Sequence, residues 1–334
     1  MKKKLFSLAL ACAMALGLAA CGQTAPAASG SASGSAAASG GEKVYQVGVI
    51  QLVQHPALDA ATQGFQDVLK EKLGDQVTID VQNAANDSAT CSTMATQMVS
   101  SNVDLIMANA TPALQAAASA TSEIPILGTS VTEYGVALSI DNFNGTVGGN
   151  ISGTSDLPPL DQQAAMVTEL VPGAKTVGIL YCSGEPNSVY QAEVVKTELE
   201  KAGLTVNTYT FADSNDVAAV TTTACNESDV LYIPTDNTAA SCTEAINNVA
   251  QPAGVPIIAG EEGICKGCGI ATLSIDYYEL GRTTGEMAVK ILTGESDIAS
   301  MPIEYYPSPV KKYDADRAAA LGITIPDGYT AIEG

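Results

Sequence analysis

The chain has 334 residues, of which 46% are hydrophobic and 15% are charged, and 36 acidic residues against 15 lysines and arginines give a formal net charge of −21 at pH 7. So acidic a chain argues against electrostatic binding to nucleic acid or to an anionic lipid surface. The length is sufficient for two domains of ordinary size.

The first 21 residues have the pattern of a targeting segment. Three lysines precede an apolar run from Leu5 to Leu18, and the small residues Ala19 and Ala20 lead to Cys21. This order is typical of a secretory signal, and the run is too short for a comfortable membrane-spanning helix of ~20 residues. An ordinary signal with an incidental cysteine is one reading of the segment.

The quartet that ends at Cys21 resembles the lipobox of bacterial lipoproteins. The resemblance implies that residues 1–20 are a lipoprotein signal peptide, cleaved before Cys21, and that Cys21 is then acylated. Lipid chains on Cys21 would anchor the protein on the extracytoplasmic face of the cell membrane. Residues 22–41 are low-complexity Ala, Ser and Gly, so we predict a flexible linker over residues 21–41 and a folded body from residue 42.

Strands and helices alternate in the first part of the body. Apolar periodicity predicts strands at 44–50, 76–82, 103–109 and 124–128, and helices at 57–73, 89–101 and 111–121. Residues 139–159 are rich in Gly, Asn, Asp and Pro and are predicted to contain a boundary between two lobes. A second series follows, with strands at 175–181, 204–211, 229–234 and 255–260, and helices at 187–203, 213–225, 237–251 and 276–295. This alternation predicts an α/β fold with parallel sheets covered by helices on both faces.

The two series resemble each other in sequence. When Asp104 is aligned with Asp229, each aspartate starts a buried strand that runs into a polar turn and a helix. In this alignment Thr111 falls at the position of Asp236. Ligands of open parallel sheets bind outside the carboxyl ends of the strands. Two lobes that face each other would therefore place both residues in one cleft.

The residues at these turns suit a zwitterionic ligand. Asp236 and Asp276 are predicted at strand-to-helix junctions, where a carboxylate can bind an ammonium group. Asn187, Ser188 and Thr111 lie at helix starts, where free N–H groups favour a carboxylate. The same residue types are also ordinary helix caps, which is the alternative for each of them.

Other chemistries have weaker support in the sequence. No nucleophile elbow, HExxH or Walker-type loop occurs, although Asp236 and Asp276 could form the carboxylate pair of a glycosidase.

The single histidine, His55, either caps a helix or lies at the cleft edge. The CxxC formed by Cys265 and Cys268 has no second pair and so is a poor zinc site. The six cysteines of the body are small buried thiols or include one local disulfide, with no pairing assigned: Cys91, Cys182, Cys225, Cys242, Cys265 and Cys268.

Several motifs stand in the order and spacing of one family. The strings "VGVIQLVQHPALDAATQGF", "NATPALQAA", "YCSGEPNSVYQ", "YIPTDNT" and "SIDYYELGRTTGEMAVKILTGE" resemble the substrate-binding lipoproteins of ABC importers, of the tryptophan/tyrosine-binding type. The resemblance covers about residues 44–325. It implies a type I periplasmic-binding-protein fold, with two Rossmann-like lobes, a hinge and a central cleft. It also implies no cofactor, no enzymatic activity and delivery of the ligand to a permease with its ATPase.

The resemblance also implies domain bounds and ligand-binding residues. The first lobe would span 42–150 with about 277–300 returning to it, the second 151–276, and residues 301–334 would cross near the hinge. The implied ligand-binding residues are Thr111, Gln115, Asn187, Ser188, Asp236, Asn237, Asp276 and Tyr277, with His55 and Tyr134 at the cleft border.

One segment departs from the family pattern. Where the family often reads Ala-Val-Thr-Asp-Pro, this chain has Ser130-Val131-Thr132-Glu133-Tyr134. Tyr134 would either stack on a ligand ring or fill space. The sequence therefore favours an amino-acid binder for an importer, with an aromatic amino acid first; a sensor for a membrane receptor and a nucleoside or sugar binder are the alternatives.

Overall fold

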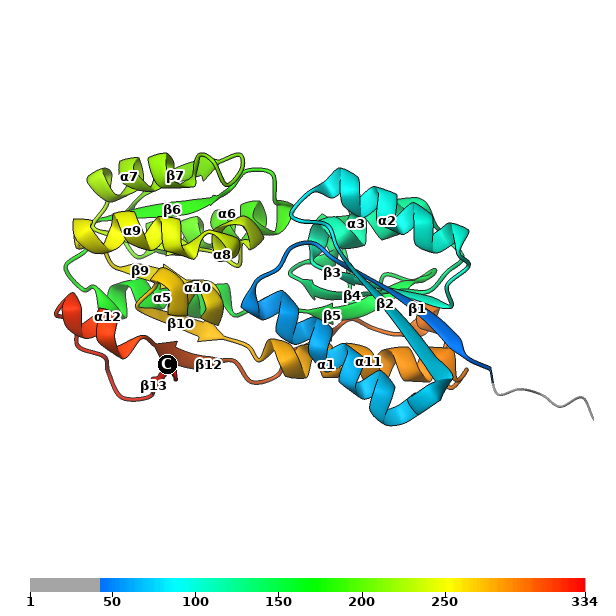
Figure 1. Cartoon of the computed structure of the whole chain (residues 1–334). Coiled ribbons are helices and arrows are strands. Elements are labelled where there is room, and N and C mark those ends of the chain that lie inside the picture. Colours follow the sequence, from blue (N-terminus) through cyan, green and yellow to red (C-terminus); the bar gives the residue numbers. More distant parts are fainter. Residues whose placement is uncertain (1–42, 334) are drawn as a thin grey trace, which may run out of the picture. The chain divides into compact units, whose positions relative to one another are not determined.

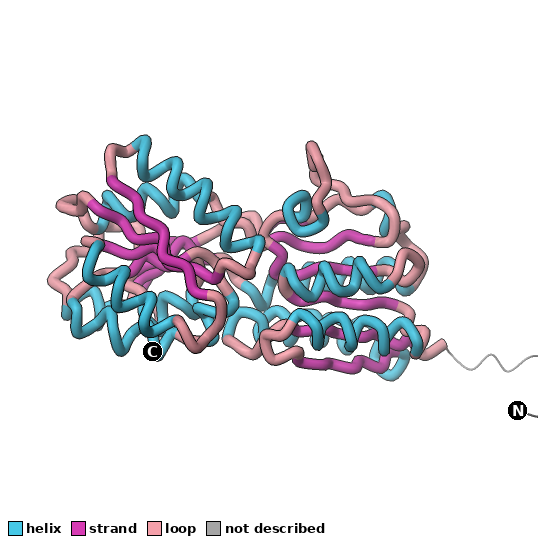
Figure 2. The backbone as a smooth tube through the Cα atoms, turned by 90° about the horizontal axis from the view of Figure 1, so that it is seen from above, coloured by secondary structure: helices cyan, strands magenta, loops and turns pink. Residues whose placement is uncertain are grey.

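The computed structural model describes residues 43–333, which form two α/β lobes, each with a mainly parallel sheet between layers of helices (Figure 1 and Figure 2). The predicted signal peptide, Cys21 and the linker lie outside the described residues. Two lobes of this kind match the type I periplasmic-binding-protein fold that the family resemblance implies.

The first lobe is built on a six-stranded sheet in the order β11-β5-β4-β3-β1-β2. Its strands are β1 (Tyr45–Gln51), β2 (Val77–Asn83), β3 (Leu105–Asn109), β4 (Ile126–Val131), β5 (Ile151–Ser155) and β11 (Glu304–Tyr305). Its helices are α1 (Pro56–Leu73), α2 (Ser88–Ser100), α3 (Thr111–Ala120), α4 (Tyr134–Leu138) and α11 (Tyr277–Leu292), with short 3₁₀ turns at Gly74–Gln76 and Ile298–Ser300.

The second lobe has a seven-stranded sheet in the order β13-β12-β10-β9-β8-β6-β7. Its strands are β6 (Thr176–Cys182), β7 (Thr205–Phe211), β8 (Val230–Ile233), β9 (Ile257–Ala259), β10 (Ala271–Ser274), β12 (Val310–Tyr313) and β13 (Thr330–Ala331). Its helices are α5 (Leu160–Leu170), α6 (Pro186–Lys201), α7 (Val217–Glu227), α8 (Asn237–Ser241), α9 (Thr243–Ala253), α10 (Glu262–Cys268) and α12 (Ala315–Ala320).

The internal repeat found in the sequence is a structural repeat. The first five strands of each lobe have the same spatial order, β2-β1-β3-β4-β5 and β7-β6-β8-β9-β10. The aligned aspartates also have matching roles, since Asp104 accepts a hydrogen bond from the N–H of Gln46 and Asp229 accepts from the N–H groups of Lys175 and Thr176. Each aspartate therefore fastens the start of its strand to the neighbouring strand.

The boundary between the lobes lies within residues 139–159, as predicted, but later than the predicted bound at residue 151. The sequence placed the start of the second lobe at residue 151, but Ile151–Ser155 forms β5, which pairs with β4 in the first sheet. All five residues of β5 are buried, yet its sequence ISGTS contains one large apolar residue, so no hydrophobic run marks the strand. The chain crosses to the second lobe after Ser155, crosses back between β10 and α11, and crosses a third time between β11 and β12.

Helices from the two ends of the body pack together in the first lobe. Helix α11 lies against α1 (Figure 1). A Cβ atom on Gly281 would overlap the carbonyl oxygen of Ala61, and a Cβ atom on Gly64 would overlap the carbonyl oxygen of Tyr278. Both glycines therefore permit a backbone approach that no larger residue allows.

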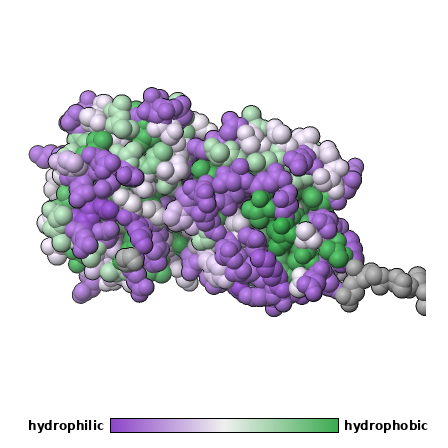
Figure 3. Space-filling view, in the orientation of Figure 1, coloured by the Kyte–Doolittle hydropathy of each residue, from purple (hydrophilic) through white to green (hydrophobic). Residues whose placement is uncertain are grey.

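The surface of the first lobe has an apolar area beside its edge strand. Figure 3 shows hydrophobic residues gathered over the part of this lobe that carries β1 and β2, where Val81 is 41% exposed.

Among the described residues, no helix is both long and apolar enough to cross a membrane.

Candidate functional site

The ends of the strands of the two lobes meet across a cleft. His55, which follows β1, lies with its Nε2 atom 3.3 Å from Oδ1 of Asn237 at the start of α8. Asn86, which follows β2, donates from Nδ2 to Oγ1 of Thr238 at 3.0 Å. Both contacts join the carboxyl edge of the first sheet to the carboxyl edge of the second, which is where the sequence predicts the ligand.

A cavity of about 560 Å³ lies between the lobes at this edge. Its walls come from the start of α1, from α8 to α10, from the second crossing and from β12. The lining residues are Pro56, Ala57, Ala60, Ala240, Thr243, Glu261, Glu262, Gly263, Lys266, Gly267, Ile275, Asp276, Tyr277, Tyr278 and Lys312. The volume lies within the range of ~300–1,000 Å³ that small-molecule sites have. Asp276 and Tyr277 are the residues of the predicted site that line it.

Glu185 organises the edge of the second lobe that faces the cleft, and the sequence analysis assigned no role to this residue. Its Oε2 atom accepts from the backbone N–H of Asn237 at 2.9 Å and from the Asn237 amide at 2.7 Å. Its Oε1 atom accepts from the N–H and the hydroxyl of Thr238 at 2.9 and 2.7 Å. Glu185 therefore holds the two residues that contact the first lobe. It lies within the string YCSGEPNSVYQ, which carries part of the family resemblance and is the signal that could have identified it.

Asp236 is a buried structural carboxylate in this arrangement. It is 1% exposed, its Oδ1 accepts from the N–H of Ala239 at 2.7 Å, and its Oδ2 accepts from the N–H of Cys182 at 2.7 Å. It therefore caps α8 and ties α8 to the end of β6. Burial, and next the charge of Glu185, raise the pKa of Asp236 to about 8.

Asn187 and Ser188 are brought to the same edge. Both are buried, and the Asn187 amide donates to the carbonyl of Thr235 at 3.1 Å, which joins the start of α6 to the end of β8. The oxygen of the Asn187 amide has no partner within the protein. Asn187 therefore retains an unused acceptor at the cleft.

The start of α3 shows backbone strain next to Thr111. Ala110, which precedes the helix, has φ +90°, and Ser130 near the end of β4 has φ +53°. Such conformations cost of order ~1–3 kcal/mol and concentrate at functional sites. Thr111 is buried as the first residue of α3, whereas Gln115 donates to the carbonyl of Ala137 at 2.9 Å and so joins α3 to α4.

Tyr134 belongs to the core of the first lobe. It is 1% exposed and its hydroxyl donates to the carbonyl of Thr154 at 3.0 Å. Its ring end occupies the space over Gly128 and Gly153, where a Cβ atom on either glycine would clash with the hydroxyl. Of the two roles that the sequence allows for Tyr134, the structure shows the space-filling one.

Asp276 and Tyr277 are neighbours at the second crossing but have different roles. Asp276 is exposed and caps α11 by accepting from the N–H of Glu279 at 3.1 Å. The hydroxyl of Tyr277 donates to Oδ2 of Asp156 at 2.9 Å, which joins the second crossing to the first. Asp156 is 3% exposed, and burial raises its pKa above the ordinary value for an aspartate.

His55 lies at the cleft edge, and it does not cap α1 with its side chain. It is 7% exposed, and burial lowers its pKa, so the imidazole is neutral at pH 7. Its Nδ1 atom has no partner within the protein. Of the two alternatives for His55, a helix cap or a residue at the cleft edge, the structure shows the second.

Buried polar atoms without a partner concentrate at this cleft. Five of the eight such side-chain atoms in residues 43–333 lie at or just after strand ends that face the other lobe: His55 Nδ1, Asn109 Oδ1, Ser130 Oγ, Asp156 Oδ1 and Asn187 Oδ1. Unsatisfied buried polar groups are rare and costly, and each requires an explanation. A polar ligand bound between the lobes would explain this set.

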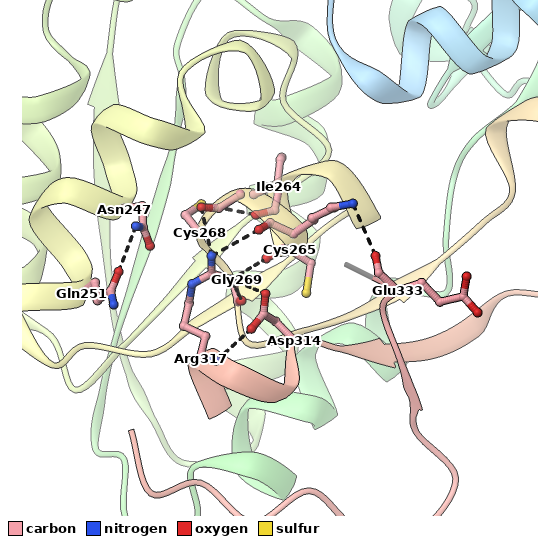
Figure 4. A network of polar contacts seen from close by, with 11 residues as sticks. Asn247, Gln251, Ile264, Cys265, Cys268, Gly269, Asp314, Arg317 and Glu333 are labelled. Atoms are coloured by element: carbon pink, nitrogen blue, oxygen red, sulfur yellow. Dashed lines mark hydrogen bonds and ion pairs between the residues drawn. The ribbon is translucent and has the colours of Figure 1, made fainter. Parts of the chain in front are cut away.

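The CxxC pair has a structural position. Cys265 and Cys268 are buried on α10, and none of the cysteines in the described body forms a disulfide. The described residues contain no group of three or more potential metal ligands. Arg317 donates to the carbonyls of Cys265, Lys266, Gly267 and Gly269 at 2.8–3.2 Å and so caps the carboxyl end of α10 (Figure 4). This cap fixes the helix that forms one wall of the cavity.

Known proteins resemble the chain over most of its length. A model of the family of ABC transporter substrate binding proteins matches residues 46–331. A tyrosine-binding protein of Clostridioides difficile (strain R20291) is 38% identical over 268 residues, which are 78% of this chain and 76% of that protein.

Two solved structures are similar at almost equal identity. An ABC domain from Streptococcus pneumoniae in complex with L-Trp is 35% identical, with a TM-score of 0.82 over 87% of this chain and 100% of the other. The ligand-free, open structure of a substrate-binding protein with adhesive properties from Clostridium difficile is 36% identical, with a TM-score of 0.66 over 87% and 99%. At nearly equal identity and coverage, the overall structure of this chain is more similar to the L-Trp complex than to the open, ligand-free structure.

The double capping by Asp236 predicts a stability effect. Asp236→Ala removes a helix cap, worth ~0.5–2 kcal/mol, and leaves buried N–H groups without an acceptor, at ~1–3 kcal/mol. We expect the free energy of unfolding in urea to fall by roughly 2–4 kcal/mol. Asp87→Ala, which removes an exposed cap of α2, is the matched control and should cost clearly less than Asp236→Ala. Equal effects of the two variants would contradict the structural role of Asp236.

The buried acids predict a pH dependence. Burial raises the pKa of Glu261 to about 7, against ~4 in the unfolded chain. The folded state then keeps a proton that the unfolded state releases, so the contribution of Glu261 to stability is fully present below about pH 4 and is lost as pH rises through 7. We expect the thermal midpoint of the ligand-free protein to fall between pH 5 and pH 8.5. Glu261→Gln should remove on the order of 3 kcal/mol of this dependence. The neighbouring Glu262→Gln should have a smaller effect, because the charge of Glu262 is only a minor cause of the raised pKa of Glu261. A midpoint that rises with pH would overturn this prediction.

Proposed function

The chain belongs to the ABC transporter substrate-binding proteins, and we propose that it binds an aromatic amino acid between its lobes and delivers it to the permease of an importer. The relatives in this family are solute-binding proteins rather than enzymes. The similarity to the structure solved with L-Trp, which extends over that whole chain, is the observation that carries the proposal.

The chemistry of the cleft supports an amino acid. The cleft combines buried acids, unpaired acceptors and the strained start of α3. Acceptors suit an ammonium group, and the first N–H groups of a helix suit a carboxylate. Each end of a zwitterion thus has a matching group, and the apolar Pro56, Ala57 and Ala60 of the cavity wall suit a ring.

Closure of the lobes would report that a ligand is bound. His55 and Asn86 bond to α8 of the second lobe only when the two edges are close together. A ligand that contacts both lobes adds affinity for this closed state and shifts the equilibrium towards it. The permease and its ATPase would then recognise the closed protein, and no cofactor is needed for this cycle.

The proposal includes a lipid anchor on Cys21. A tethered protein would stay near its permease while the linker at residues 22–41 lets the body move. We expect Cys21→Ser to move the protein from the membrane fraction to the soluble fraction, as measured by immunoblotting of fractionated cells. Cys12→Ser, which lies within the apolar run, is the control and should leave the distribution unchanged. Membrane association of Cys21→Ser equal to that of the parent would overturn the anchor.

The ligand is tested by thermal shift of the purified protein against all common amino acids, nucleosides and small sugars. A ligand at 100 times its dissociation constant stabilises the folded state by about 2.7 kcal/mol. We expect shifts with tyrosine, tryptophan or phenylalanine and none with the nucleosides or sugars. A shift confined to nucleosides or sugars would overturn the amino-acid proposal.

A further inference from the structure

We infer that Asp156 is the residue that recognises the ammonium group of the ligand, with Tyr277 positioning its carboxylate. This inference rests on the proposed function and specifies which residue in the cleft selects the amino group.

Asp156 is the buried acid with a free oxygen. Four carboxylates are buried in the described body: Asp156, Glu185, Asp236 and Glu261. Both oxygens of Glu185 and of Asp236 accept hydrogen bonds, and those of Glu261 accept from the N–H groups of Gly263 and Ile264. Oδ1 of Asp156 has no partner within the protein.

The surroundings of Asp156 contain no cation. No lysine or arginine in residues 43–333 forms an ion pair with it. Its other oxygen is held by the Tyr277 hydroxyl, and the nearby Glu261 adds a second negative charge. A buried carboxylate without a cation is costly. A primary ammonium group would supply both the charge and three donors.

The position of Asp156 links recognition to closure. It directly follows β5 at the first crossing, and Tyr277 begins α11 at the second crossing. The hydrogen bond between them therefore spans two of the three segments at which the lobes turn relative to each other. An ammonium group bound to Oδ1 would lie beside the hinge, with the loops of both lobes around it.

The same geometry explains why Asp276 and Asp236 are poorer partners for the ammonium group. Asp276 is exposed and caps its own helix, and each oxygen of Asp236 already accepts a backbone N–H. The exposed Asp161, five positions after Asp156, lies in the first turn of α5. Asp161 provides a control with the same charge change.

The test is isothermal titration of the full-length protein with L-tyrosine, L-tryptophan and the corresponding acids that lack the amino group. We expect the parent protein to bind the amino acids and to bind the deaminated acids far more weakly. Asp156→Asn should weaken binding of the amino acids by at least about 30-fold and leave the affinity for the deaminated acids unchanged. Tyr277→Phe should have a smaller effect in the same direction, and Asp161→Asn should have none.

The outcomes separate the inference from the proposed function. Equal binding of amino acids and deaminated acids by the parent protein would overturn the inference, and this comparison needs no variant. Binding of the amino acids by Asp156→Asn within a few-fold of the parent would also overturn it, while the proposed function would stand. No amino-acid binding by the parent would overturn the proposed function. The thermal midpoint of ligand-free Asp156→Asn should not fall, because the substitution removes an uncompensated buried charge.

Discussion

The carboxylate of Glu185 fixes the surface through which the second lobe meets the first. It accepts hydrogen bonds from backbone and side chain of both Asn237 and Thr238, and these two residues contact His55 and Asn86 across the cleft. Hydrogen bonds to a charged acceptor are shorter and stronger than neutral ones. Glu185 can therefore hold a short helix, α8, in a defined orientation that its own five residues would not maintain.

The cleft is dominated by acids that have few basic partners. Desolvation raises the pKa of Asp156, Asp236 and Glu261, so each of them is easier to protonate than an exposed acid. A cation bound beside such an acid favours its charged form, so a ligand ammonium group and the carboxylate would stabilise each other. The lowered pKa of His55 keeps its imidazole neutral, so His55 adds no positive charge to the cleft.

Much of the fold was predictable because most elements carry their own local signal. The β–α alternation and the match between Asp104 and Asp229 predicted two similar α/β lobes, and the structure shows that their first five strands have the same order. Strand β5 was not predicted, because ISGTS is buried by its neighbours and lacks an apolar pattern. The helix predicted at 237–251 is two helices, α8 and α9, which separate at Cys242. Local sequence does not report burial that distant segments impose.

The candidate site was predictable in location and only partly in detail. Strand ends with Asn, Ser, Thr and Asp predicted the cleft edge, but the sequence could not distinguish a capping carboxylate from one that is free for a ligand. Asp236 and Asp276 have capping bonds in the structure, whereas Asp156 lies in a segment read as linker and has a free oxygen. That distinction depends on which N–H groups the fold brings within reach. The role of Glu185 could not be predicted for the same reason, since its hydrogen-bond partners lie more than fifty positions away in the chain.

The packing of α11 on α1 has a consequence for the order of folding. The first lobe needs the close approach of Gly64 and Gly281, and it also needs β11, so it is completed only when most of the chain is present. Strands β6 to β10 of the second lobe come from one continuous stretch of chain. Contacts between distant segments form slowly, because a long loop must close first. The continuous part of the second lobe, β6 to β10, should therefore form before the first lobe is complete, and β12 and β13 join its sheet later.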